Sequence, residues 1–513
     1  MRILRPNRVF ALSAAALGAT LVHAAVPRPV NAPPPPTGQP GGFTPPVGAR
    51  PPVPAPPPTT TAPTAPPPPT APAPPTTPPV STITPPAIPA PGTSGATFTD
   101  PTGQFTSLNV RGTATAANPF FQPLGTNGRA CVTCHQADQG WTITPPKVQA
   151  LFARTNGLDP LFRTVDGANS PEEDVDTLAQ RRSAYSMLLN RAVIRVGLPI
   201  PQTGEFTLST LDDPYNFSNS LELSLFRRPL PATSLPFLST VMWDGRKTGV
   251  GATLSTNLQA QAIDAILGHA EATLAPSSTV IQQIVAFETA SATAQSFDNQ
   301  AGLLTSAGAT GGPGALVTQP FHIGINDSIG ADPAGGAFNP RAFTLFNSWA
   351  STTATPAQQA IARGQAIFNN RRFTVMHVAG LNDALGQTAV TATCTTCHNT
   401  PNVGNHSVPR FFDLGLTDTI RRTPDLPLYT LKNKVSGITR ETTDPGRALM
   451  TGKWNDIGKF KVPVLRGLAA RAPYFHDGSA RNIGEVIAFY DRRFGMRLTP
   501  QDRSDLAAFL NAL

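Results

Sequence analysis

The sequence predicts an all-α, mainly helical protein, because several segments carry apolar residues at helical spacing and no long segment alternates like a strand. The clearest case is 499–513, where Thr499 caps a helix that Pro500 begins and apolar residues recur on one stripe. Residues 482–490 and 355–368 show the same spacing. The fold class therefore rests on helices in the second half of the chain.

Residues 1–24 have the pattern of a signal peptide. Arg2, Arg5 and Arg8 form a basic start, an apolar stretch follows, and Ala24 ends a small-residue cleavage site. The apolar stretch is too short to span a bilayer. We therefore expect a periplasmic protein, secreted through this signal, with no membrane span in the mature chain.

Residues 25–96 are expected to form a disordered, proline-rich linker. Between positions 27 and 95 lie 29 of the 57 prolines of the chain, mixed with Thr and Ala and almost without charge. This composition favours an extended, polyproline-II-like chain that cannot bury an apolar core. The remaining residues, 97–513, are enough for two domains of ordinary size.

All four cysteines of the chain lie in two C-x-x-C-H motifs. The residues are Cys131, Cys134 and His135 in the first motif and Cys394, Cys397 and His398 in the second. A C-x-x-C pair fits half of a zinc site or a redox dithiol, but a histidine directly after it is typical of haem c attachment. The thiols then bond to the haem and the histidine ligates the iron. Zinc remains an alternative, although the motifs lie far beyond the usual zinc-ribbon spacing. We expect two covalently bound haems c.

The order of short motifs along 97–513 resembles that of the bacterial dihaem cytochrome c peroxidases and their relative MauG, the methylamine dehydrogenase maturation enzyme. W-D-G-R at 243–246 lies between the two haem motifs, and P-Y-F-H-D-G at 473–478 follows the second. The resemblance implies two cytochrome c-like helical domains with one haem each. The N-terminal domain, 97–345 with insertions, would hold the haem that activates peroxide. The C-terminal domain, 346–513, would hold the electron-transfer haem.

The resemblance implies catalytic roles for three residues. Trp243 corresponds to the tryptophan between the haems, where its ring relays an electron or holds a radical; core packing is its alternative role. Gln261 and Glu271 correspond to residues of the peroxide pocket. A partly desolvated Glu can take a proton from one peroxide oxygen and return it to the other. His269 is a rival for that role, because a neutral imidazole is also a capable proton shuttle.

The first haem is expected to have an open sixth position, as in MauG. In many of the peroxidases, a loop histidine between the first haem motif and the tryptophan motif occupies that position until the enzyme is reduced. Here no histidine lies between His135 and Trp243, and Met187 and Met242 are the only methionines in that span.

Tyr490 is the expected axial ligand of the second haem. It stands where the peroxidases carry a methionine, counted from His476 of the H-D-G motif, and MauG has a tyrosine ligand. A phenolate stabilises ferric iron and lowers its reduction potential, whereas a thioether raises it. Met450 and Met496 are alternative sulfur ligands, and a core tyrosine bonded to a backbone carbonyl is a further alternative. His476 is expected to lie beside the ligands without binding iron.

Calcium, which the family holds between its domains, is doubtful in this chain. The resemblance places Arg228 where the family has an asparagine ligand, and a cation is an unfavourable neighbour for Ca²⁺. The backbone carbonyls of Arg471 and Pro473 do not make a calcium site by themselves.

The formal net charge of +8 over 513 residues is mild, and no basic run marks a nucleic-acid binder. We therefore expect no nucleic-acid partner. Part of the basic excess is expected to neutralise haem propionates or to meet an acidic redox partner, and most of it to lie on a solvated surface.

The sequence therefore predicts a periplasmic dihaem c-type peroxidase that reduces hydrogen peroxide. Its electrons would come from a small donor protein such as a cytochrome c or a cupredoxin. One alternative is a MauG-like oxidase of a protein or organic substrate that acts through a high-valent dihaem state. Another is a dihaem electron-transfer protein with both irons six-coordinate. Tyr490 and the missing loop histidine favour the MauG-like alternative.

Overall fold

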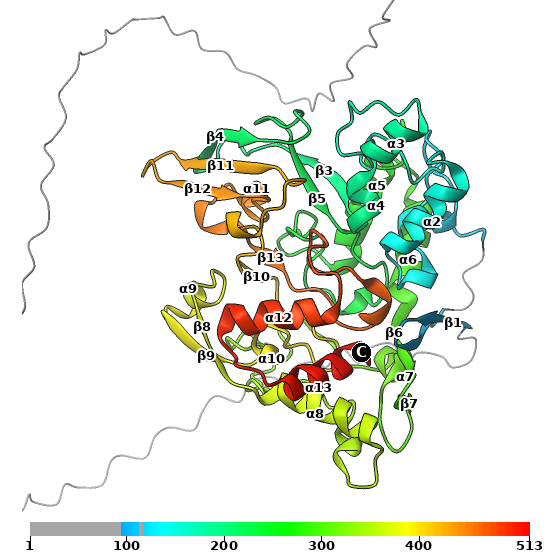
Figure 1. Ribbon diagram of the computed structural model, residues 1–513, viewed down its shortest axis with the longest axis vertical. Helices are drawn as coiled ribbons and strands as arrows, with labels where there is room; N and C mark the ends of the chain where they lie inside the picture. The colour runs from blue at the N-terminus through cyan, green and yellow to red at the C-terminus, as the bar shows by residue number, and fades with distance from the viewer. Residues whose placement is uncertain (1–93, 112–115) are drawn as a thin grey trace, which may run out of the picture. The chain divides into compact units, whose positions relative to one another are not determined.

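The structure of the protein is a computed structural model that describes residues 94–111 and 116–513 (Figure 1). The expected signal peptide and nearly all of the expected linker lie outside the described residues. The described residues belong to one unit, Pro78–Leu513. The division of this unit at residue 345 into two cytochrome c-like domains stays a prediction.

The all-α prediction is wrong, because the described residues are 33% helical and 17% strand and form five small sheets. In two of the strands, polar residues at inward positions interrupt the apolar alternation that a sequence could reveal. Strand β6 (Ser291–Asp298) begins with five consecutive buried residues, among them the polar Thr293 and Gln295. In β2 (Gly103–Asn109) the inward positions include Ser107, whose hydroxyl shares a 2.6 Å hydrogen bond with Thr293. Polar side chains that satisfy one another inside a sheet leave no period-2 hydrophobic signal.

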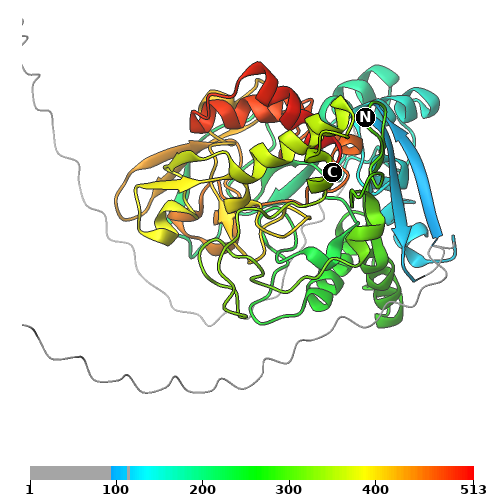
Figure 2. The ribbon, with the colours of Figure 1, turned by 90° about the horizontal axis from the view of Figure 1, so that it is seen from below.

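The sheets are antiparallel and join segments that are distant in the chain. One sheet has the order β1-β2-β6-β7, and Figure 2 shows its β1–β2 hairpin in blue. A second sheet, β12-β11-β4, pairs 206–212 with 428–433 and so joins the two halves of the chain. The remaining pairs are β3–β5, β8–β9 and β10–β13. The other strands are β1 (Ser94–Asp100), β3 (Ile194–Leu198), β4 (Phe206–Asp212), β5 (Leu223–Arg227), β7 (Gly302–Leu303), β8 (Phe373–Met376), β9 (Ala389–Ala392), β10 (Phe411–Phe412), β11 (Leu428–Asn433), β12 (Thr439–Thr442) and β13 (Phe460–Lys461).

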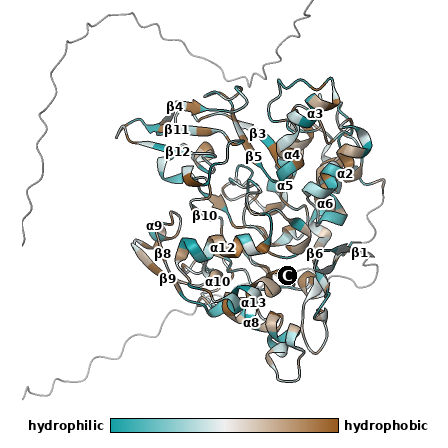
Figure 3. Cartoon of the chain, viewed as in Figure 1, coloured by the Kyte–Doolittle hydropathy of each residue, from teal (hydrophilic) through white to brown (hydrophobic). Residues whose placement is uncertain are grey.

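The three helices predicted from spacing are confirmed, and they pack together as α8, α12 and α13 (Figure 1). Helix α13 (Pro500–Asn511) begins after Thr499, whose hydroxyl accepts a hydrogen bond from the backbone N–H of Asp502. Helices α8 (Pro356–Asn370) and α12 (Ile483–Phe494) are capped in the same way by Thr355 and Asn482. Figure 3 shows hydrophilic and hydrophobic residues mixed along α12, as expected for a helix with one apolar face.

The remaining helices are shorter, apart from α5 and α6, which pack against each other in the first half of the chain. Apolar side chains of α5 and α6 form a core cluster with Phe120 and Trp141, beside the first C-x-x-C-H motif. These helices are α1 (Cys131–Cys134), α2 (Pro145–Thr155), α3 (Leu178–Ala184), α4 (Ser186–Arg191), α5 (Leu254–Gly268), α6 (Ser278–Ala290), α7 (Gly312–Val317), α9 (Asn382–Leu385), α10 (Cys394–Cys397) and α11 (Ala448–Thr451).

A buried cluster of charges ties three distant segments together. The Arg227 guanidinium donates to both carboxylate oxygens of Asp444, at 2.7 and 2.9 Å, and to Asp244 at 2.5 Å. The side chains of all three residues are no more than 4% exposed. Because Asp244 directly follows Trp243, this cluster fixes the backbone of the W-D-G-R motif.

We predict that Arg227→Ala lowers the free energy of unfolding by about 3–5 kcal/mol, because it removes the guanidinium that two buried carboxylates share and leaves only Arg246 as a cationic hydrogen-bond partner of Asp244. Lys147→Ala is the matched control: it removes an ion pair with Asp138 whose side chains are 56% and 39% exposed, and should cost less than about 1 kcal/mol. Chemical denaturation of both variants measures the difference, and equal losses would contradict a structural role for the buried cluster.

Candidate functional site

The two C-x-x-C-H motifs adopt the same local structure. Each C-x-x-C forms a one-turn helix, α1 or α10, and the backbone N–H of the following histidine donates to the carbonyl of the first cysteine at 3.0 Å. In both motifs a threonine hydroxyl, of Thr133 or Thr396, accepts from the backbone N–H three residues earlier at 3.0 Å. This shared turn places the two thiols and the imidazole of each motif together.

Both histidines have their Nδ1 atom engaged by a backbone carbonyl. Nδ1–H of His135 donates to the carbonyl of Trp141 at 3.1 Å, and that of His398 donates to Gly404 at 2.6 Å. Burial lowers the pKa of His398 to about 4 and also lowers the pKa of His135. Each imidazole is therefore neutral and has its Nε2 lone pair free for a metal ion, which is the usual arrangement of a histidine ligand.

The first motif opens into a cavity whose wall contains several of the predicted residues. Gln261 and Trp243 line this cavity, as does His269, the residue that ends α5. Glu271 is absent from its lining, and its side chain is exposed. The Glu271 carboxylate accepts a 3.0 Å hydrogen bond from Asn127. The structure therefore brings Gln261, Trp243 and His269 to the first motif and places Glu271 outside the cavity wall.

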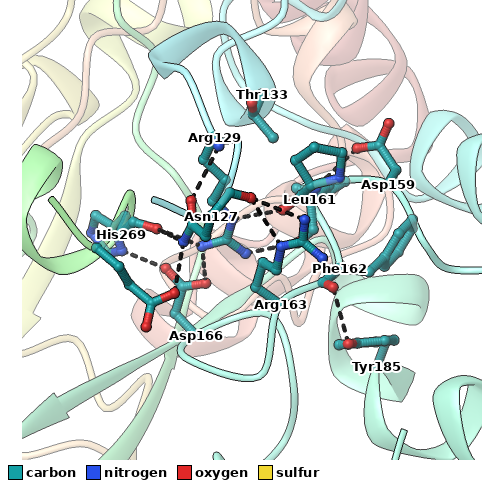
Figure 4. A network of polar contacts seen from close by, with 12 residues as sticks. Asn127, Arg129, Thr133, Asp159, Leu161, Phe162, Arg163, Asp166, Tyr185 and His269 are labelled. Carbon is teal, nitrogen blue, oxygen red and sulfur yellow. Dashed lines mark hydrogen bonds and ion pairs between the residues drawn. The ribbon is translucent and has the colours of Figure 1, made fainter. Parts of the chain in front are cut away.

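A network of hydrogen bonds and ion pairs holds His269 in position (Figure 4). Its Nδ1 contacts the Asp166 carboxylate, and Asp166 also forms an ion pair with Arg129. Its backbone carbonyl accepts from Asn127 at 2.8 Å and from Arg129 at 3.3 Å. Asp166 and Arg129 also line the cavity. This network could not be predicted from the sequence, because its members are distant in the chain and none lies in a recognisable motif.

The second motif opens into a separate, mainly apolar cavity. Tyr490 and Met496 both line it, and so does His476. Met450 is elsewhere and packs against the core cluster around β4 and β11. Met187 is buried in another cluster, whereas Met242 lines the first cavity. Among the alternative sulfur donors, only Met496 lies with the second motif.

Tyr490 differs from the four other tyrosines in the hydrogen bonding of its hydroxyl. The other hydroxyls each donate to a backbone carbonyl at 2.8 to 3.0 Å, in Tyr185, Tyr215, Tyr429 and Tyr474. The Tyr490 hydroxyl makes no hydrogen bond with any residue in 94–111 or 116–513, and burial raises its pKa. A buried hydroxyl that faces a cavity without a partner is suited to bind a ligand there.

Trp243 forms part of the wall between the two cavities, because it lines both. Its indole N–H donates to the carbonyl of Arg228 at 2.8 Å, and its own carbonyl accepts from Lys461 at 2.9 Å. Its ring meets the His476 ring edge to face, at a centroid distance of 6.4 Å. The ring is therefore held in one orientation beside both motifs.

Three buried cations line the cavities without an acidic partner. A group that fits these cavities must therefore bring negative charge, and this requirement tests whether haem fits. Arg228 and Lys461 line both cavities, and Arg471 lines the second. Burial lowers their pKa values to about 9, 7 and 10, and in the described part of the chain they donate only to backbone carbonyls. Buried cations need an anionic partner, and haem propionates are such anions. The residues present therefore fit two haems.

The cysteines lie in these two separate cavities, Cys131 and Cys134 in the first and Cys394 and Cys397 in the second. Across 94–111 and 116–513, no three His, Cys, Asp or Glu side chains gather as a metal site would require.

Glu288, a buried acid that also lines the first cavity, was missed by sequence reasoning. Burial raises its pKa to about 8, so it is largely neutral at pH 7.

Comparison with known proteins gives three informative relatives. The chain is 28% identical over 188 residues to cytochrome-c peroxidase IdrP1 of Pseudomonas sp. (strain SCT), covering 33% of this chain and 43% of the relative. It is 33% identical over 145 residues to IdrP1 of Denitromonas iodatirespirans, covering 24% and 37%. It is 31% identical over 121 residues to cytochrome c551 peroxidase of Pseudomonas aeruginosa, covering 23% and 30%. The matches thus span less than half of each relative.

A solved structure described as a MauG-like protein associated with microbial copper homeostasis aligns with 77% of this chain and 86% of its own. Its sequence identity is 17% and its TM-score 0.37. No protein-family model matches the chain. Within the described ranges, none of the helices has the length and apolar character needed to cross a bilayer.

The two cavities, each with a C-x-x-C-H motif, define a c-type cytochrome class of protein, for which haem c is the implied cofactor. The curated relatives are named cytochrome c peroxidases, which supports the resemblance of the motifs to the dihaem cytochrome c peroxidase and MauG family.

We predict two covalently bound haems per chain, because both motifs have the same turn and the same histidine geometry. A haemochrome assay on denatured protein should give two haems, and the double variant Cys131→Ser/Cys134→Ser should retain one. One haem in the unaltered protein, or stoichiometric zinc, would contradict this expectation.

Proposed function

We propose that this protein is a periplasmic dihaem c-type peroxidase that reduces hydrogen peroxide with electrons from a small redox donor. The observation that carries the proposal is the pair of separate cavities, each built on a C-x-x-C-H turn, with Trp243 in the wall of both. The peroxidase names of the relatives support it. Haem iron, when bound, supplies the redox chemistry of peroxide reduction.

The first cavity is the proposed peroxide site. His135 would hold the iron of a bound haem. Apart from His135, the only histidine of its lining is His269, whose Nδ1 is engaged by Asp166. The span between His135 and Trp243, which carries the loop histidine in many of the peroxidases, contains no histidine. The Gln261 amide lines the same cavity and is suited to donate a hydrogen bond to a bound peroxide.

The second cavity is the proposed electron-transfer site, where His398 and Tyr490 would hold the iron of a bound haem. The support is the unpartnered Tyr490 hydroxyl, because the other tyrosines satisfy theirs with backbone carbonyls. Trp243 would relay electrons between the two sites, since its ring is fixed by the indole hydrogen bond to the Arg228 carbonyl and its backbone by a hydrogen bond from Lys461. The donor would be a small protein such as a cytochrome c or a cupredoxin.

Tyr490 also favours a second candidate function, a MauG-like oxidase of a protein or organic substrate. An anionic oxygen ligand disfavours reduction to the ferrous state, which suits removal of electrons from a substrate better than rapid exchange with a donor. Calcium has no part in either proposal. The Arg228 guanidinium donates at 3.1 Å to the carbonyl of Arg471, one of the groups that a calcium ion would need.

We predict that the fully oxidised protein already has one high-spin haem that binds cyanide or peroxide without prior reduction. The reason is that no histidine lies between His135 and Trp243, the span in which many of the peroxidases carry the loop histidine that closes this position. Electron paramagnetic resonance and absorbance titration with cyanide measure this. Two low-spin, unreactive haems would contradict the peroxidase and favour the dihaem electron carrier.

We predict that Tyr490→Phe keeps both haems attached but raises the reduction potential of the second by at least about 59 mV, a tenfold change in the one-electron equilibrium. Spectroelectrochemical titration measures the shift. Tyr474→Phe is the matched control, because Tyr474 lines the same cavity but its hydroxyl donates to the Leu468 carbonyl at 2.8 Å. If Met496→Ala alone changes the low-spin spectrum, the axial ligand is sulfur.

A further inference from the structure

The residue best placed for proton transfer in the first cavity is His269. It ends α5 at the cavity wall, and its side chain is 40% exposed. Its Nδ1 contacts the Asp166 carboxylate, which has no proton to give when ionised, so Nδ1 carries the proton and donates it. Nε2 is then unprotonated, and it makes no hydrogen bond within the described part of the chain. The free lone pair of the ring is thus available to a molecule in the cavity.

Asp166 is built to hold this tautomer. Burial alone would raise the pKa of Asp166, but the charge of Arg129 and the hydrogen bond with His269 lower it below the usual range. The carboxylate is therefore an anion at neutral pH. Arg129 in turn donates at 2.8 and 2.7 Å to the carbonyls of Pro160 and Leu161, which fix its position. A buried carboxylate that orients a histidine is a recurrent arrangement for general acid–base catalysis.

Glu271 has none of these features. Its side chain is exposed, it does not line the cavity, and its backbone has φ of 54°, so it no longer continues helix α5. Its carboxylate is bonded to Asn127. An exposed carboxylate that does not line the cavity is poorly placed to take a proton from a molecule inside.

We propose that His269, oriented by Asp166, is the acid–base catalyst of peroxide cleavage in the first cavity, in place of Glu271. This inference rests on the proposed function. Nε2 of His269 accepts the proton of one peroxide oxygen and returns it to the other as the O–O bond breaks, so the first water leaves with both original protons. The remaining oxygen becomes the second water with two electrons from the donor and two protons from solvent.

The test compares His269→Gln with Glu271→Gln in the dihaem protein, after both variants are shown to keep two haems and an unchanged melting temperature. Stopped-flow absorbance measures the reaction with hydrogen peroxide. We expect His269→Gln to slow it about 10²- to 10⁴-fold, the usual effect of losing an acid–base group, and Glu271→Gln to leave it within about twofold.

Cyanide gives a second readout that needs no turnover. Hydrogen cyanide must lose its proton when it binds iron, so a base in the cavity accelerates its association. We expect His269→Gln to slow cyanide association by more than about tenfold and Glu271→Gln to leave it unchanged. The opposite pattern, or equal rates in all three proteins, would overturn the proposal.

The two readouts separate this inference from the proposed function. If the unaltered protein reacts with peroxide and His269→Gln reacts equally fast, the His269 role fails and the peroxidase stands. If the unaltered protein does not react with peroxide but His269→Gln still slows cyanide association, the peroxidase proposal fails and the role of His269 as a base is retained.

Asp166 is a positioning residue, and Asp166→Asn tests it. The amide keeps the shape of the carboxylate but removes its charge. It also favours the wrong tautomer of the His269 ring, the one without a proton on Nδ1. We expect a slower peroxide reaction and slower cyanide association at unchanged haem content, with Asp166→Glu recovering part of both. A variant that changes only the melting temperature would show that Asp166 has a structural role alone.

Discussion

The buried guanidinium of Arg227 is the interaction on which the arrangement of the two sites depends. It bonds to Asp244 and Asp444, and its neighbour in the chain, Arg228, contributes to the wall of both cavities. Asp244 is the neighbour of Trp243. One cation therefore fixes the positions of an aromatic ring and a second guanidinium between the two sites. Burying three charges is costly unless every donor and acceptor is used, and this requirement allows a single geometry for the wall.

Local patterns predicted local structure well. Capping residues and apolar stripes identified α8, α12 and α13, and the C-x-x-C-H motifs predicted two equivalent attachment turns. The strands were not predictable, because their inward residues include threonine, serine and glutamine that bond to one another across the sheet. Such pairs are set by contacts between distant segments, which no single stretch of sequence records.

The same limit applies at the first site. Trp243, Gln261 and Tyr490 line the cavities where the motifs suggested, but the sequence left His269 and Glu271 as rivals for the proton-transfer role. His269 is the C-cap residue of α5 and still has helical backbone angles. The backbone at Glu271 has positive φ, and its side chain does not line the cavity. The partner of His269, Asp166, lies about a hundred residues earlier and becomes visible only in three dimensions.

The unpaired cations around the cavities have a consequence for biogenesis. Arg228, Lys461 and Arg471 are buried with backbone carbonyls as their only described partners, so an empty chain must bear the cost of desolvating these basic groups. The propionates of the two proposed haems would remove that cost once the cofactors are in place. Ligands that bind the folded state alone shift the folding equilibrium toward it. Binding of the proposed cofactors would thus drive the chain to its final folded form.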